Sequence, residues 1–198
     1  MRLMTRTALA SLAVLAVASC DRSIEPVEPT SAPAGAPSEA AMSAAPTRQV
    51  GGLAIEGEGL RVFDAEGAAR ALPFGTAQQS VITAVNITVG GAAPEQSTNE
   101  ECGQGPVQFA QYANGLQLLF QNGEFRGWFL REAGLTTADG IGVGTTRADL
   151  NAARTVEIQT DSTLGVEFNA GDLGGFLTAA DGSGTVESLY AGETCFFR

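Results

Sequence analysis

Two segments of this chain align with each other without a gap, and they restrict the fold to one that contains antiparallel strands. The first is LQLLFQNGEFRGWF, residues 116–129, and the second is LGVEFNAGDLGGFL, residues 164–177. The identical positions are Leu116/Leu164, Phe120/Phe168, Gly123/Gly171 and Gly127/Gly175. In each segment apolar residues alternate with others, a turn containing glycine follows, and a second apolar run comes next. Each segment is therefore predicted to form a β-hairpin.

A helix start precedes each hairpin. Thr76 with Gln79, and Thr146 with Asp149, have the spacing of a capping box, in which two side chains satisfy free amides of the first turn. Apolar residues then recur at helical spacing, at Val81, Ile82 and Val85 in the first case and at Leu150 and Ala153 in the second. We therefore expect an α+β fold of two tandem helix-plus-antiparallel-hairpin repeats, with the helices packed on the sheet.

The repeats are expected at about residues 60–131 and 135–197, and other elements lie around the two hairpins. One strand is predicted within Leu53–Phe63 and one or two within Thr185–Phe197. The segment Gly90–Pro106 is rich in turn-forming residues and is expected to be an irregular loop.

The glycine-rich stretch GIGVGTTRADL, residues 140–150, is interpreted as a helix start. A dinucleotide-binding loop needs a third glycine where this chain has Thr145 or Arg147, and a Walker A loop needs a lysine. The alternative is an anion held at the N-terminus of the helix. No cofactor is predicted.

The N-terminus has the layout of an export signal. Arg2 and Arg6 precede an apolar run from about Ala8 to Ala18, which is too short to span a bilayer. The run ends in the sequence VASC, Val17–Cys20, which resembles the lipobox of bacterial lipoproteins. That resemblance implies a signal peptide over residues 1–19, removed before Cys20.

The same resemblance implies that acyl chains on Cys20 anchor the chain to a membrane in the cell envelope, on its periplasmic face. Asp21 resembles the signal that keeps such proteins in the inner membrane, and the outer membrane is the alternative. Residues 20–49, rich in proline, alanine and serine and without an aromatic residue, are predicted to be the lipidated cysteine and a disordered tether. A folded domain is expected over residues 50–198.

Charge and composition exclude several classes of function. The chain has 22 acidic residues and 11 basic ones, and with no lysine and no histidine all the basic residues are arginine. A net charge of −11 repels nucleic acid, so no nucleic-acid partner is expected. Catalysis that requires histidine or lysine and zinc sites that use imidazole are excluded. No metal site or catalytic residue is predicted, and a carboxylate-dependent hydrolase is the enzyme that remains as an alternative.

Two cysteines, Cys102 and Cys195, remain after lipidation of Cys20. In an oxidising compartment they are expected to form a disulfide that ties the loop of the first repeat to the last strand. A redox or metal-binding pair is the functional alternative.

The candidate partner-binding residues lie in one strand and one loop. In EFRGWFL, residues 124–130, strict alternation places Phe125 on one face and Arg126 and Trp128 on the other, with apolar neighbours on both. One face is expected to be core, and the other to be covered by a helix, the second repeat or a partner. Glu100 and Glu101 are the candidates in the loop.

The export signal, the lipobox, the spacer and the helix start GTTRADL resemble the small lipoproteins of outer-membrane barrel assembly. The tandem arrangement is similar to the proteinaceous β-lactamase inhibitors. In those families helices pack on a twisted antiparallel sheet, whose exposed face or hairpin tips bind other proteins. The resemblance implies a non-enzymatic module that binds another envelope protein. The alternatives are a peptidoglycan or glycan hydrolase, and a carrier with an apolar pocket between helix and sheet.

Overall fold

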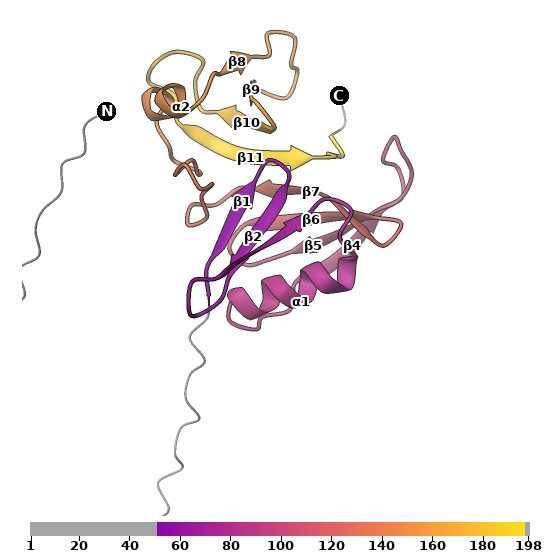
Figure 1. Cartoon of the computed structure of the whole chain (residues 1–198). Coiled ribbons are helices and arrows are strands. Elements are labelled where there is room, and N and C mark those ends of the chain that lie inside the picture. The colour runs from indigo at the N-terminus through magenta and orange to yellow at the C-terminus, as the bar shows by residue number, and fades with distance from the viewer. Residues whose placement is uncertain (1–50, 197–198) are drawn as a thin grey trace, which may run out of the picture. The chain divides into compact units, whose positions relative to one another are not determined.

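The computed structural model describes residues 51–196, and the predicted signal peptide, lipobox and tether lie outside these residues. The described chain forms two antiparallel sheets and two helices (Figure 1). The small sheet contains β1 (Leu53–Glu56), β2 (Gly59–Phe63) and β3 (Ala69–Pro73). The large, eight-stranded sheet has the order β4-β5-β6-β7-β11-β10-β9-β8. Its strands are β4 (Glu95–Asn99), β5 (Val107–Gln111), β6 (Leu116–Gln121), β7 (Glu124–Leu130), β8 (Glu157–Ile158), β9 (Val166–Ala170), β10 (Leu173–Leu177) and β11 (Val186–Gly192).

The α+β class is confirmed, but the finer prediction of tandem helix-plus-hairpin repeats is wrong. Strands dominate: α1 (Gln78–Thr88) precedes a four-stranded meander, β4 to β7, and the shorter α2 (Arg147–Ala153) precedes another, β8 to β11. Both predicted hairpins exist, yet their registers differ. Phe120 pairs with Phe125 in the first, whereas the aligned Phe168 pairs with Gly175 in the second. The sequence similarity therefore marks two hairpins rather than two equivalent units.

Two further differences and one confirmed prediction concern elements outside the hairpins. The predicted single strand before α1 is a separate three-stranded sheet, since β1 turns back into β2 and β2 into β3. The expected irregular loop, Gly90–Pro106, contains the edge strand β4. The C-terminal segment provides one strand, β11, which pairs with β7 and so joins the two meanders.

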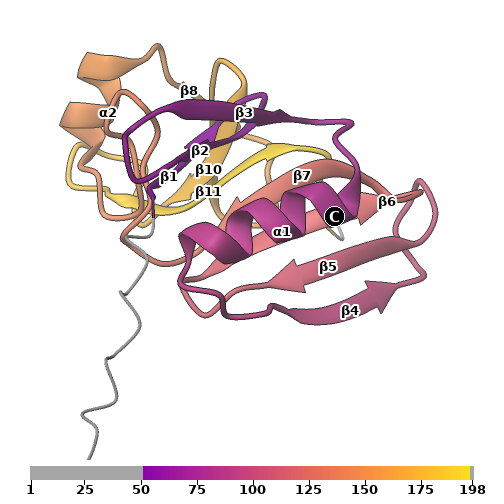
Figure 2. The ribbon, with the colours of Figure 1, turned by 60° about the horizontal axis from the view of Figure 1, so that its bottom comes forward.

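One large core lies between the eight-stranded sheet and the layer formed by α1 and the small sheet. Figure 2 shows α1 running across strands β5 to β7. Val81 and Val85 of α1 are fully buried in this core together with Leu118 and Trp128 of the sheet. The indole Nε1 of Trp128 donates a hydrogen bond of 2.9 Å to the backbone oxygen of Glu56, which ties β7 to β1. Burial of these apolar side chains is the main stabilising contribution in a domain of this size.

The helix starts differ from each other. The side chain of Thr146 accepts a 3.1 Å hydrogen bond from the Asp149 amide, which confirms the predicted cap of α2. The predicted capping box of α1 is wrong, because its N-cap is Ala77 and makes no side-chain cap. The turn between β6 and β7 takes the place of a cap: the Gln78 amide donates to the Gly123 oxygen at 2.8 Å. The Thr76 hydroxyl instead donates to the Pro73 oxygen.

A β-bulge decides which side chains of β7 reach the core. Leu119 pairs with Gly127 but the next residue, Phe120, pairs with Phe125, so Arg126 is an extra residue in β7. Because a bulge resets the alternation of side chains, Phe125 lies on the same face as Trp128 instead of opposite to it. The alternation predicted for this strand is therefore wrong.

Candidate binding face

The face of the eight-stranded sheet opposite α1, here called the outer face, carries a second set of apolar side chains. Phe109 of β5, Leu119 of β6 and Phe129 of β7 line one hollow on this face. Phe129 also lies 6.4 Å from Tyr190 of β11, ring centre to ring centre, and Tyr190 lies 6.0 Å from Phe176 of β10. The outer face thus carries an aromatic row across β7, β11 and β10.

Tyr190 and a carboxylate lie close together on this face because of a missing side chain. A Cβ placed at Gly174 would approach the Tyr190 ring to 2.2 Å, so the ring lies directly over that glycine. The Tyr190 hydroxyl reaches across to Glu167 on β9 and donates a 2.7 Å hydrogen bond to its Oε1. Glu167 is 1% exposed, so this hydrogen bond compensates part of the cost of burying its carboxyl group.

The residues after β11 cross the outer face, and we call Glu193–Phe196 the strap. The Glu193 amide donates to the Arg126 oxygen at 2.9 Å, and its carboxylate forms an ion pair with the Arg126 guanidinium. The hydrogen bonds that the Arg126 guanidinium donates to the Glu193 carboxylate, together with the negative charge of that carboxylate, raise the pKa of Arg126. Cys195 is joined to Cys102, with their Cα atoms 5.5 Å apart, so the predicted disulfide is confirmed.

Phe196 closes the strap over the aromatic row. Its ring meets Tyr190, Phe129 and Phe176 edge-on, at centroid distances of 5.3, 5.7 and 5.9 Å. The Arg131 guanidinium lies 4.8 Å from the centre of the Phe129 ring on the same surface. Edge-to-face packing of this kind is favourable beyond the apolar area that it buries.

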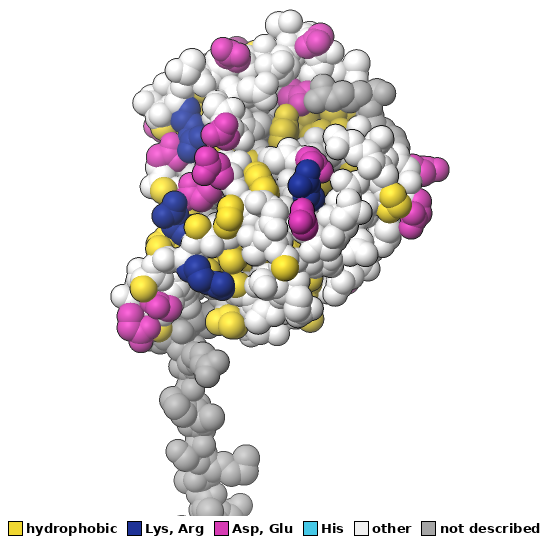
Figure 3. Space-filling view, turned by 45° about the vertical axis from the view of Figure 1, so that its right-hand side comes forward, with side chains coloured by type: hydrophobic (Ala, Val, Ile, Leu, Met, Phe, Trp, Pro, Cys, Tyr) yellow, Lys and Arg dark blue, Asp and Glu magenta, His cyan; other side chains and the backbone are white. Residues whose placement is uncertain are grey.

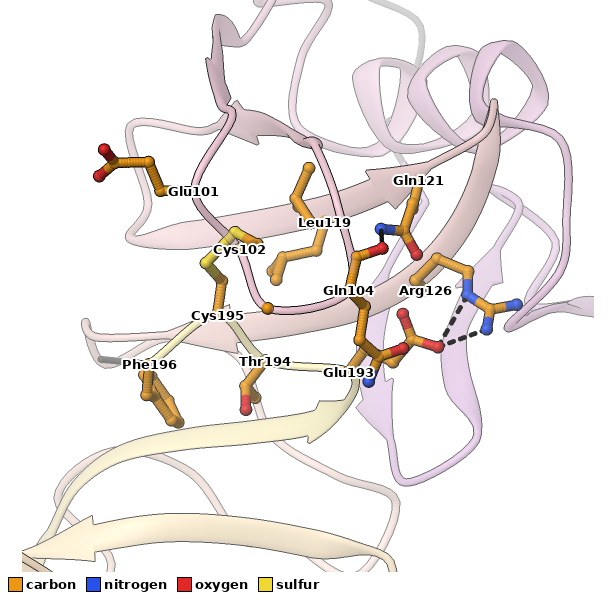
Figure 4. A pocket seen from close by; sticks show the side chains of 12 residues that line it. Glu101, Cys102, Gln104, Leu119, Gln121, Arg126, Glu193, Thr194, Cys195 and Phe196 are labelled. Carbon is orange, nitrogen blue, oxygen red and sulfur yellow. Dashed lines mark hydrogen bonds and ion pairs between the residues drawn. A yellow bond between two sulfur atoms is a disulfide. The ribbon is translucent and has the colours of Figure 1, made fainter. Parts of the chain in front are cut away.

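Three hollows lie on the outer face, and strap residues line two of them. The first, of about 220 Å³, is walled by the disulfide and by Leu119 and has Arg126 and Glu193 at its rim (Figure 4). The second, about 320 Å³, lies between Phe129, Phe176 and the exposed Leu164, and the third, about 130 Å³, lies between them along the sheet. Figure 3 shows hydrophobic side chains reaching the surface in this view, with acidic side chains spread around them.

The carboxylates of the first hollow do not converge on one point. Glu101 and Glu193 both line it, but Figure 4 shows the Glu101 carboxylate pointing away from that of Glu193, which is held by Arg126. Within residues 51–196 no group of three or more histidine, cysteine, aspartate or glutamate residues could hold a metal ion. The space between α1 and the sheet, where a carrier would hold its ligand, is filled by Val81, Val85 and Trp128.

The candidate partner-binding residues are separated in the structure. Trp128 and Phe125 are fully buried in the main core, so neither side chain is exposed on the outer face. Arg126 and Glu101 do lie on the outer face, at the rim of the first hollow. Glu100 is exposed in the turn after β4 and does not line that hollow.

The sequence interpretation missed most of the outer face. Phe129, Tyr190 and Phe196 form its centre, and none of the three was among the candidate partner-binding residues. A usable signal was present in VESLYAG, residues 186–192, where both alternating sets of positions include large side chains, Leu189 in one and Tyr190 in the other. Such a strand is covered on both faces.

No protein family, curated protein or solved structure matches this chain in the comparisons that we made. The resemblance of residues 17–20 to a lipobox, and that of the folded part to barrel-assembly lipoproteins and β-lactamase inhibitors, therefore have no support beyond the sequence itself. Among residues 51–196, neither helix has the length and apolar character needed to cross a bilayer.

Proposed function

We propose that this chain is a lipid-anchored module of the bacterial envelope that binds another envelope protein through its outer face and catalyses no reaction. The observation that carries this proposal is the aromatic row of Phe129, Phe176 and Tyr190 with hollows on either side of it. Neither α1 nor the small sheet lies over this face, since both pack on the other one. Aromatic side chains beside hollows are the usual anchors of a protein interface.

The composition of the surface supports a protein partner over a polyanion. The mature chain predicted from the lipobox has 9 arginines against 22 acidic residues, a net charge of 9 − 22 = −13. Such a charge steers the protein away from anionic lipid and nucleic acid and toward surfaces that are neutral or basic. The proposed anchor on Cys20 would keep the domain near one membrane, so the partners that it meets are proteins at that membrane.

Two exposed side chains provide a matched test. Leu164 lines the second hollow on the outer face and is 38% exposed, whereas Ile87 lies on α1 and is 53% exposed. The tagged protein would be purified from solubilised membranes as wild type, as Leu164→Glu and as Ile87→Glu, and the retained proteins compared by mass spectrometry. We expect one envelope protein to be enriched with wild type and Ile87→Glu and lost with Leu164→Glu. Equal retention by all three forms would refute the proposal.

A further inference from the structure

The strap occupies the part of the outer face that a partner would need. Phe196 makes three edge-on contacts, with Phe129, Phe176 and Tyr190, and so covers the centre of the aromatic row. It lines both the first and the third hollow. A partner that inserts its own apolar side chain at this point competes directly with Phe196.

Few interactions hold the strap against the rest of the protein. Glu193 is held by its backbone and its ion pair to Arg126. Beyond it, Thr194, Cys195 and Phe196 form no backbone hydrogen bond with another described residue. Three interactions hold the C-terminal part of the strap. They are the disulfide to Cys102, a weak contact of 3.8 Å from the side-chain amide of Asn99 to the Cys195 sulfur, and the packing of Phe196.

The disulfide that holds the strap can be reached from solvent. The disulfide forms part of the wall of the first hollow, and Cys195 is partly exposed. Cys102 belongs to a small cluster with Val107 and Leu119 that is separate from the main core. Opening this bond therefore leaves the packing around Trp128 untouched.

We propose that the Cys102–Cys195 disulfide is a redox switch. Its reduction releases the strap and exposes the aromatic row to a protein partner. The use of this opening for partner capture rests on the proposed function, whereas the opening itself does not. In the oxidised form Phe196 competes with the partner, and in the reduced form that competition is lost.

The reductant in this proposal is a protein dithiol, and the reaction is thiol–disulfide exchange. One thiolate of the dithiol attacks the Cys195 sulfur, forms a mixed disulfide and releases Cys102 as a thiolate, which takes up a proton. The second thiolate of the reductant then attacks the reductant's first sulfur in the mixed disulfide. This releases Cys195 as a thiolate, which is protonated in turn. The chain gains two electrons and two protons, and the dithiol leaves as a disulfide.

The opening can be measured without the partner. The full chain would be studied oxidised, after reduction by dithiothreitol, and as the Cys102→Ser/Cys195→Ser variant. The probe of uncovered surface is the anionic dye 8-anilinonaphthalene-1-sulfonate, whose fluorescence rises when it binds apolar surface. We expect dye fluorescence to rise roughly two-fold or more in both open forms. Exchange of the Glu193 amide with deuterium should rise as well. The emission of Trp128, the single tryptophan of the chain, should stay the same because it reports on the core of the other face.

A second variant separates strap release from loss of the disulfide. Phe196→Ala with an intact disulfide should raise dye binding in the oxidised form, and reduction should then add little. Unchanged dye binding after complete reduction would overturn the proposal, because packing alone would then hold the strap. A shift of Trp128 emission to longer wavelength would also overturn it, since the disulfide would then hold the whole fold.

The regulatory use is tested in cells with a photoactivatable residue at Leu164. More adduct from the Cys102→Ser/Cys195→Ser variant than from the oxidised chain is the expected result. Equal adduct from both would overturn the regulation while leaving the proposed function intact. Dye binding that rises on reduction, with no adduct from any form, would overturn the proposed function and with it the regulatory use of the strap.

Discussion

At the scale of single residues, two adjacent glycines let the sheet carry aromatic rings on both of its faces. A Cβ at Gly174 would come within 2.2 Å of the Tyr190 ring on the outer face. A Cβ at Gly175 would come within 2.7 Å of the Phe168 ring, which lies in the main core. Because neither glycine has a side chain, both rings can approach the backbone of β10 closely.

Replacement of Gly174 by alanine should therefore destabilise the protein. The methyl group forces the Tyr190 ring off its position, and such overpacking costs about 1–3 kcal/mol of unfolding free energy. Urea unfolding followed by Trp128 emission measures this change. Gly182→Ala is the matched control, since a Cβ there meets nothing within 4 Å, and its effect should stay within about 0.5 kcal/mol. Equal effects of the two substitutions would show that Tyr190 does not lie where the structure places it.

Asp139 makes stability depend on pH. Hydrogen bonds from Arg154, at 2.8 Å to both carboxylate oxygens, lower its pKa to about 2, with help from the Thr137 hydroxyl. Since the pKa in the folded state lies below the unfolded value of about 4, the stabilisation is complete above pH 4 and is lost as the pH falls toward 2.

Asp139→Asn tests this dependence. The pair with Arg154 is partly exposed, so we expect a loss of up to about 1 kcal/mol at pH 7. The difference from wild type should shrink as the pH falls and should vanish near pH 2. Urea unfolding at a series of pH values measures both, with the exposed Asp161→Asn as a control. A constant difference across the series would contradict the pKa assigned to Asp139.

At the scale of elements, the two helix starts show what local sequence can and cannot predict. Thr146 and Asp149 form a cap whose partners lie within one turn, and this cap was predictable. Thr76 and Gln79 have the same spacing, yet the amide of Gln78 is satisfied by Gly123 of a distant turn. Side-chain capping is therefore replaced by a tertiary contact that no local pattern contains.

The two helix starts are expected to lose different amounts of stability when their threonine is replaced by alanine. Thr146→Ala removes the acceptor of the Asp149 amide and should cost about 1 kcal/mol, within the usual range for an N-cap. Thr76→Ala should cost less, since its hydroxyl makes a single bond, to the Pro73 oxygen, and caps no helix amide. Thermal unfolding of both variants would decide this, and a larger effect at Thr76 would contradict the assignment of the caps.

The strand β7 shows why the candidate site was only partly predicted. Its apolar composition correctly predicted a strand with apolar side chains on both faces. The bulge at Arg126 shifts the alternation by one residue, so Phe125 and Trp128 both join the core. A bulge depends on the register with the neighbouring strand, and one strand's sequence does not contain that register.

At the scale of the whole molecule, the parts that were predictable are those set by short-range patterns. The α+β class, both hairpins, both helices and the disulfide follow from turns, periodicity and the cysteine count. The position of Phe196 depends on contacts with residues far away in the chain, such as Phe129. The strap in particular carries no periodic pattern, because it is neither helix nor strand beyond Gly192.

The proposed anchor gives a prediction for the whole chain. Cys20→Ser should move the protein from the membrane fraction to the soluble periplasmic fraction, because the substitution removes the thiol that would carry the acyl chains. Cell fractionation and labelling with a clickable palmitate analogue would measure this, with Cys102→Ser/Cys195→Ser as the control that should keep its label. Incorporation of label into Cys20→Ser would show that another residue carries the acyl chain and would contradict the proposed anchor.

The central claim is that the outer face, and not the helical face, binds another envelope protein. The chain has no lysine, so amine-reactive crosslinkers cannot attach to its side chains. The most direct measurement is therefore photocrosslinking in living cells, with a photoactivatable residue at Leu164 on the outer face or at Ile87 on α1. We predict one discrete adduct of a second envelope protein from position 164 and none from position 87. The same adducts from both positions, or none from position 164 in either redox form, would contradict the account.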